Sequence, residues 1–288
     1  MHLTLASPRA LPTGAIIIFL LTPDAVNWSR FAYTQYVTNT AYLCNSVMLF
    51  ETLHRLGSKA ERLMIYPERF SIDEQDSPSE SRLLRKAREE FGVRLVPVKV
   101  QSRDGDDPTW AESYTKLLAF NQTQYEPNGR TLPPLPPPCP VAMPRAYWLN
   151  PADRTLSSQL LLIQPSTFEF NRVMTAMSNA GSSDYDMEIV NDLYRDSALI
   201  LPHRPYDLLT GEFRSKKHTA YLRNDVESWD PEGPWVSASS DAVQAEQPSC
   251  DVNSTTGQEE DCRARDLWLV FNADFAARRK VGVMFSLA

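Results

Sequence analysis

Apolar and polar positions alternate in blocks over residues 31–121, and the blocks predict strands and helices in turn. The strand-like blocks are short and rich in aromatic or β-branched residues. The helix-like blocks are longer, and two of them end at a glycine. The predicted strands are residues 31–37, 62–66 and 93–100, and the predicted helices are residues 41–56, 79–91 and 112–125.

This alternation indicates an α/β fold with a mostly parallel central sheet flanked by helices. The segment 41–56 has apolar residues on nearly every face, so we expect its helix to be buried. Pro97 stands in the middle of the third strand. Because proline has no N–H to donate, that strand is expected at an edge of the sheet or at a bulge.

The rhythm breaks at residues 126–144, which are too rich in proline for an interior strand or helix. Strands are expected again at 159–163 and 198–201, with helices at 167–177 and 186–194. Residues 232–261 are polar and acidic and predict a mobile loop. A closing helix is expected at 263–281. The predicted organisation is one domain over 31–231, interrupted by the proline-rich stretch, then the loop and a C-terminal helix within 262–288.

The first 30 residues contain one apolar run, residues 15–21. A membrane-spanning helix needs about 20 apolar residues, so this run does not predict a span. Two interpretations stay open: a tail or buried strand, or the remnant of a signal or anchor segment with a weak basic flank at Arg9.

Composition narrows the function classes. Lys and Arg number 29 against 36 Asp and Glu, and the net charge of −7 argues against general nucleic-acid binding. Four cysteines are too few for a disulfide-built scaffold, although Cys250 and Cys262 could pair across the polar loop. No Cys or His set has zinc spacing. Glycosylation triplets at Asn27, Asn121 and Asn253 permit a secretory location.

Polar side chains follow the first predicted strand, where ligands bind in open α/β sheets. Thr38 and Asn39 could donate hydrogen bonds to a nucleotide, and Tyr42 could stack on its base. The simpler alternative is that these residues only cap the helix that follows.

Several motifs follow one another in a characteristic order. The first is Thr-Asn-x-Ala-Tyr at 38–42, followed by the buried helix and Leu-Gly-Ser-Lys-Ala. Further segments follow at residues 114–125, 139–142, 164–166, 184–188 and 201–208. Together they resemble glycosyltransferase family 8, the glycogenin-like enzymes, and especially fungal members regarded as N-acetylglucosaminyltransferases, in which these segments occur in the same order. The resemblance implies a GT-A-like single domain, a UDP-sugar donor, a glycan or protein acceptor, and a divalent metal, usually manganese. It also implies the Golgi lumen of the secretory pathway, with a cytoplasmic location as the alternative.

Matched residue by residue, the resemblance places a uridine pocket at Tyr36, Thr38, Asn39 and Tyr42. It places Lys116 near the diphosphate and donor sugar, whereas without the family this residue would be read as a solvated helix lysine. Asp184 and Asp186 match the acidic segment that faces the donor and acceptor sugars, and they are the candidate catalytic residues. Their simpler reading is that of acids at a helix N-terminus.

Two departures from the family pattern put activity in doubt. The family's apolar strand ending in Asp-x-Asp, which binds the metal, is absent between Glu126 and Cys139. The late segment with a metal-binding His and a phosphate-binding Lys is absent before Trp235. The sequence Asp104-Gly-Asp106 is an Asp-x-Asp placed one unit too early. Skipped exons, a splice form or a degenerate paralogue would each explain the gaps, so two hypotheses stand: a UDP-sugar transferase, or an inactive relative that binds a nucleotide or a partner.

Overall fold

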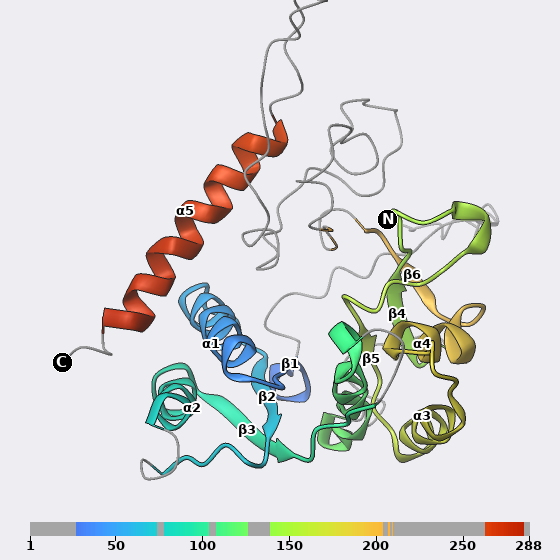
Figure 1. Ribbon diagram of the computed structural model, residues 1–288, viewed down its shortest axis with the longest axis horizontal. Helices are drawn as coiled ribbons and strands as arrows, with labels where there is room; N and C mark the ends of the chain where they lie inside the picture. The colour runs from blue at the N-terminus through green and yellow to red at the C-terminus, as the bar shows by residue number, and fades with distance from the viewer. Residues whose placement is uncertain are drawn as a thin grey trace, which may run out of the picture.

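The computed structural model describes residues 27–73, 78–103, 108–125, 139–203, 207, 209 and 263–284 (Figure 1). These residues form an α/β structure with two three-stranded sheets, which confirms the predicted fold class. The proline-rich residues 126–138, the polar segment 232–261, the first 26 residues and the proposed Cys250–Cys262 pair lie outside the described residues. No helix in the described part is both long and apolar enough to cross a bilayer.

The first sheet is the predicted strand–helix–strand repeat. It consists of β1 (Ala32–Tyr36), β2 (Glu61–Pro67) and β3 (Val93–Val98), in the order β1-β2-β3 with both pairs parallel. The connecting helices are α1 (Thr40–Arg55) and α2 (Pro78–Phe91). Since all three strands run the same way, their carboxyl ends meet at one edge, as the sequence predicts.

Local signals in the sequence explain where these elements end. Gly57 follows α1 with φ 69°, and Gly92 separates α2 from β3 with φ 63°. Both values lie in the left-handed region, which a glycine adopts without the steric cost that a Cβ would bring. The prediction for Pro97 is also confirmed, because within the described part of the chain β3 is one of the two edge strands of its sheet.

β2 is buried on both faces, and its side chains divide between two cores. Met64 and Tyr66 pack with residues of α1 and α2. Leu63 and Ile65 point to the opposite face, where they pack with Tyr125. This alternation follows from the two-residue period of a strand, and it explains why the segment is apolar at successive positions.

The second sheet is mixed and more irregular. It contains β4 (Val141–Pro144), β5 (Leu162–Ile163) and β6 (Leu199–Leu201), in the order β5-β4-β6. β4 runs antiparallel to β5 and parallel to β6. The sequence predicted β6 and a longer version of β5. The prediction that residues 126–144 hold no interior strand is wrong for the last four of them, because β4 is the middle strand of this sheet and Pro144 stands only at its end. The helices α3 (Thr167–Asn179) and α4 (Asp186–Tyr194) appear where they were expected.

The helix predicted over 112–125 is the element that differs most from expectation. It is a 3-10 helix, η4 (Ser113–Asn121), followed by the short η5 (Thr123–Tyr125). A 3-10 helix places every third residue on one face. Tyr114, Leu117 and Phe120 accordingly form one stripe, and all three are buried in the second core.

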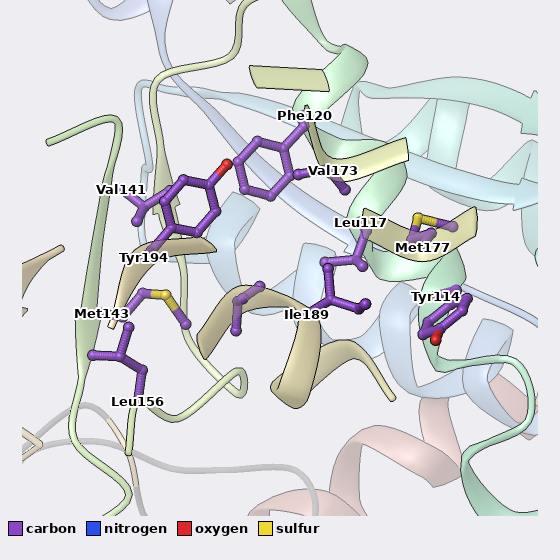
Figure 2. Packing of buried hydrophobic residues seen from close by; sticks show 11 residues of the cluster. Tyr114, Leu117, Phe120, Val141, Met143, Leu156, Val173, Met177, Ile189 and Tyr194 are labelled. Atoms are coloured by element: carbon purple, nitrogen blue, oxygen red, sulfur yellow. The ribbon is translucent and has the colours of Figure 1, made fainter. Parts of the chain in front are cut away.

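The second core joins η4 to α3, α4 and β4 (Figure 2). Its central contact is the stack of Phe120 on Tyr194, with ring centroids 5.9 Å apart and an interplanar angle of 8°. Leu118 and Ala119, on other faces of η4, pack against the first sheet. The 3-10 helix therefore lies between the two sheets and contributes to both cores (Figure 1).

The closing helix, α5 (Arg263–Met284), confirms the last predicted element. It lies beside α1, and Arg278 of α5 forms an ion pair with Glu51 of α1. Arg278 also pairs with Asp274 at 2.6 Å within α5. The hydrogen bond that Arg278 donates to Asp274, together with the negative charges of Glu51 and Asp274, raises the pKa of Arg278 above its ordinary value, and burial opposes part of that rise.

The stack in the second core predicts that two phenylalanines contribute very differently to the free energy of unfolding. Phe120 is fully buried, whereas Phe168 on α3 is 69% exposed. Phe120→Ala should lower the free energy of unfolding by about 3–5 kcal/mol, because it leaves a cavity beside Tyr194. The matched control Phe168→Ala should cost less than about 1 kcal/mol. Urea unfolding of both variants measures the difference, and similar losses would contradict the placement of η4 in this core.

Candidate functional site

Lys116 is the centre of a polar cluster at the start of α4. Its Nζ lies 2.5 Å from Asp186 Oδ2 and donates to the Ser158 carbonyl oxygen at 3.0 Å. The lysine side chain is 21% exposed and that of Asp186 is 6% exposed. The reading of Lys116 as a solvated helix lysine is therefore wrong. Its ammonium is held in place by the charge-assisted hydrogen bond that it donates to Asp186, a residue 70 positions later in the chain.

The 3-10 geometry of η4 explains how Lys116 reaches α4. Ser113 and Lys116 are three residues apart and lie on one face of the helix. The Asp186 backbone N–H donates to Ser113 Oγ at 3.4 Å, while its carboxylate accepts from Lys116. Two successive turns of η4 thus contact the first residue of α4.

The same lysine reaches the carboxyl end of the first sheet. Its Nζ lies 5.7 Å from the ring centroid of Tyr36, the last residue of β1, which is within the range of a cation–π contact. The structure therefore brings together Tyr36, Lys116 and Asp186. These residues come from three separate elements, and the sequence named each of them as a site residue.

Asp184 has different surroundings from Asp186. Its Oδ2 accepts a hydrogen bond of 2.6 Å from the Gly181 backbone N–H, which closes the turn before α4. Its carbonyl oxygen accepts from the Tyr114 hydroxyl at 2.7 Å, and Arg103 donates to the same hydroxyl at 2.9 Å. The described contacts of Asp184 thus tie the turn to η4, and none of them joins its carboxylate to Lys116.

The turn after β1 is organised by helix capping. Asn39 Oδ1 accepts a hydrogen bond of 3.1 Å from the Tyr42 backbone N–H and is the N-cap of α1, which confirms the capping interpretation for this residue. Thr38 is buried, and its carbonyl oxygen accepts from Arg69 Nη2 at 2.7 Å. Tyr42 is 51% exposed, so its side chain is not committed to the core.

Asp207 belongs to this cluster, although the sequence did not single it out. It is 2% exposed, and the Ser157 side chain hydrogen-bonds its carboxyl group. Burial raises the pKa of Asp207 to about 6, and the hydrogen bond and the nearby charge of Lys116 oppose that rise. The signal that could have found it is an acid soon after the apolar strand 198–201, at the end of a sheet.

The described residues do not fit a site for a divalent metal. They contain no group of three His, Cys, Asp or Glu side chains that could hold an ion. The early Asp104-Gly-Asp106 motif lies outside the described residues. The described acids near Lys116 are engaged by lysine, serine and backbone donors.

The buried ion pair should be strongly coupled. Lys116→Met or Asp186→Asn alone leaves the other charge or donor without its partner, which should lower the free energy of unfolding by about 3 kcal/mol or more. The double variant should lose clearly less than the sum of the two. The exposed pair Arg88–Glu89 is the matched control, and its coupling should stay below about 0.5 kcal/mol. Equal coupling in both cycles would show that the pair is not buried in solution.

Asp207 should make stability depend on pH in a defined direction. Its pKa in the folded chain is about 6, above the ordinary 3.8, so the folded state holds the proton more tightly. The group therefore destabilises the chain increasingly as pH rises from about 4 to 6, and fully above that range. Asp207→Asn should raise the free energy of unfolding by ~1–3 kcal/mol at pH 7.5 and change it little at pH 4.

Urea titrations at the two pH values measure this effect. Asp196→Asn is the control, because that side chain is 83% exposed and should respond at neither pH. A destabilised Asp207→Asn chain at pH 7.5 would contradict the burial of a charged carboxylate.

No family model matches this chain. It is 50% identical to glucose N-acetyltransferase 1 of Gibberella zeae over 289 positions, which cover 88% of this chain and 63% of that protein. It is 40% identical to glucose N-acetyltransferase 1 of Aspergillus fumigatus over 300 positions, which cover 90% of this chain and 78% of that protein. The chain thus spans less than two thirds of the Gibberella zeae relative.

In both alignments the number of aligned positions exceeds the number of residues that this chain contributes. With the Gibberella zeae protein, 88% of 288 residues is about 253 residues against 289 positions, so about 36 positions have no counterpart here. With the Aspergillus fumigatus protein, 90% is about 259 residues against 300 positions, which leaves about 41. Each relative therefore carries residues inside the aligned region that this chain lacks. At 40% identity over 78% of one relative's length, the chain belongs to the family of fungal glucose N-acetyltransferase 1 proteins.

Proposed function

We propose that this chain carries the donor site of a UDP-sugar transferase of glycosyltransferase family 8. The observation that supports it best is the meeting of Tyr36, Lys116 and Asp186 at the carboxyl end of β1. Parallel sheets bind nucleotides at this edge. A partly buried ammonium beside an aromatic ring and a helix start is a suitable place for a diphosphate.

The contacts of these residues suggest how a donor would be held. Tyr42 is exposed in the first turn of α1 and would stack on the uracil, while Thr38 and Asn39 keep the turn rigid. Lys116 is the nearby cation, and in the free chain Asp186 neutralises it. A diphosphate would compete with this carboxylate for the ammonium, so Asp186 would then be free to accept a hydrogen bond from the sugar.

The name of the relatives, glucose N-acetyltransferase 1, points to a second chemistry, the transfer of an acetyl group. The transfer of N-acetylglucosamine from a UDP donor is the reading that the family 8 resemblance favours. The two reactions use different donors, a nucleotide sugar and an activated acetyl compound. They can therefore be separated by offering each donor to the same protein.

We also propose that this chain, as it stands, binds the donor without transferring it. The uridine contacts bind ground state and transition state alike, so they lower no barrier. Rate enhancement needs groups that meet the charge developing on the leaving diphosphate, and losing one such group typically costs ~10²–10³ in rate. We place the expected manganese ligands among the 36 to 41 or so positions that the relatives have and this chain lacks.

Titration calorimetry and a UDP-release assay test both proposals. We expect the chain to bind UDP and UDP-N-acetylglucosamine, and Lys116→Met to weaken both by roughly tenfold, since it removes one charged contact. The exposed Lys59→Met is the matched control and should leave both affinities unchanged. With manganese and an acceptor, the chain should release no UDP, whereas a chimera that regains the missing segments from the Gibberella zeae relative should release it.

Three results would count against these proposals. Manganese-dependent UDP release by the unmodified chain would refute the claim that it is inactive and would direct attention to Asp104 and Asp106. Absence of any UDP binding would refute the donor site. Acetyl transfer from acetyl-coenzyme A by the chimera, without use of the nucleotide sugar, would favour the chemistry in the relatives' name.

A further inference from the structure

One carboxylate oxygen in the polar cluster has no hydrogen-bond donor. Asp207 is 2% exposed, and its Oδ2 is buried without a partner among the described residues. The Ser157 side chain hydrogen-bonds the carboxyl group but leaves Oδ2 without a partner. A buried carboxylate oxygen without a donor loses its hydration and gains nothing in return, so its presence in a folded chain calls for an explanation.

Lys116, the described cation whose charge acts on Asp207, cannot supply the missing donor without breaking other contacts. Lys116 Nζ already donates to Asp186 Oδ2 and to the Ser158 carbonyl oxygen, and its third contact is a long one of 3.4 Å to Ser158 Oγ. The charge of Lys116 acts on Asp207 at a distance and only partly offsets its burial. Among the described residues, Asp207 Oδ2 therefore keeps an unused acceptor position, which a donor from a ligand could fill.

The charges around Asp207 restrict what this ligand group is. Lys116, Asp186 and Asp207 together carry one excess negative charge when both acids are ionised. A phosphate oxygen would be repelled by Asp207, so phosphate is not its partner. A neutral hydroxyl can donate one hydrogen bond to a carboxylate without adding charge, and such charge-assisted bonds are among the strong ones.

We propose that Asp207 Oδ2 accepts a hydrogen bond from a hydroxyl of the bound sugar, and that Asp207 thereby makes the site prefer a nucleotide sugar over the free nucleotide. This inference rests on the proposed function, because it assumes that the diphosphate lies at Lys116. Asp207 binds and orients the sugar. Its buried, unpartnered oxygen is a cost in the free chain that ligand binding removes.

The test compares UDP with UDP-N-acetylglucosamine by titration calorimetry on the full chain and on Asp207→Asn. The unmodified chain should bind the nucleotide sugar more tightly than UDP. Asp207→Asn should reduce this preference by roughly tenfold or more, the size expected for a hydrogen bond to a charged group. Its affinity for UDP itself should stay within about twofold. Asp196→Asn, at an exposed position, should change neither affinity.

Deoxy analogues of the sugar identify the contact itself. Of UDP-N-acetylglucosamine analogues that lack the 3-, 4- or 6-hydroxyl, one should bind the unmodified chain about tenfold or more weakly. Asp207→Asn should bind that analogue and the parent sugar equally well. Far-UV circular dichroism checks the fold of the variant. If Asp207→Asn does not fold, Asp207→Ser replaces it, and the analogues still probe the contact on the unmodified chain.

The possible outcomes separate this inference from the proposed function. A chain that binds UDP but shows no preference for the sugar, or an Asp207→Asn chain that keeps the preference, overturns the role of Asp207 alone. Equal losses for the same analogue in both proteins overturn it too. Manganese that binds the unmodified chain without nucleotide and is lost in Asp207→Asn would identify a cation as the partner instead. A chain that binds neither ligand overturns the proposed function and this inference with it.

Discussion

The ion pair between Lys116 and Asp186 is the contact on which the candidate site depends. It joins η4, which packs against the first sheet, to α4, which belongs to the second core. Both charges are largely removed from water, so their attraction has to offset a desolvation cost of several kcal/mol for each ion. An arrangement of this kind contributes little net stability, but it fixes the position of an ammonium at the carboxyl end of β1.

The 3-10 form of η4 is the constraint that makes this pair possible. Most 3-10 helices are short, because their hydrogen-bond geometry is poorer than that of an α-helix. With nine residues, η4 is longer than most. Its three-residue period lets one apolar stripe, with Leu117 and Phe120, enter the second core while Ser113 and Lys116 face the start of α4. In an α-helix with 3.6 residues per turn, these two stripes would drift apart around the axis.

The sequence predicted the parallel repeat well because its signals are local. Alternating apolar blocks, the two glycines at positive φ and the proline in an edge strand each determine their own segment. It could not predict the second sheet in full, since β5 has two residues and β4 takes its strand form from pairing with partners on both sides. The sequence predicted a helix over 112–125 but not its 3-10 form, because that form depends on contacts in two cores.

The residues of the candidate site likewise fall into those that the sequence could identify and one that only the structure shows. Tyr36, Lys116 and Asp186 were found through a resemblance, since nothing in their spacing shows that they meet. Asp207 was missed because its unusual property, a carboxylate with an unpartnered oxygen, exists only once the chain is folded around it.

The free edge of the first sheet links the fold to the residues that the relatives have and this chain lacks. Within the described part of the chain, β1 pairs only with β2, so its other edge carries backbone groups that no strand engages. Native sheets rarely leave such an edge uncovered. The contact of η4 with this sheet runs through its face, where Leu118 and Ala119 pack with Leu63 and Ile65. A strand needs about five residues, far fewer than the 36 to 41 or so positions that the relatives have in addition.

We infer that an added strand beside β1 would displace no described strand. Lys116 and Asp186 would keep their places, because their contact runs through η4 and α4. A chain without that strand can therefore retain the polar cluster while lacking the groups that the family pattern places after it.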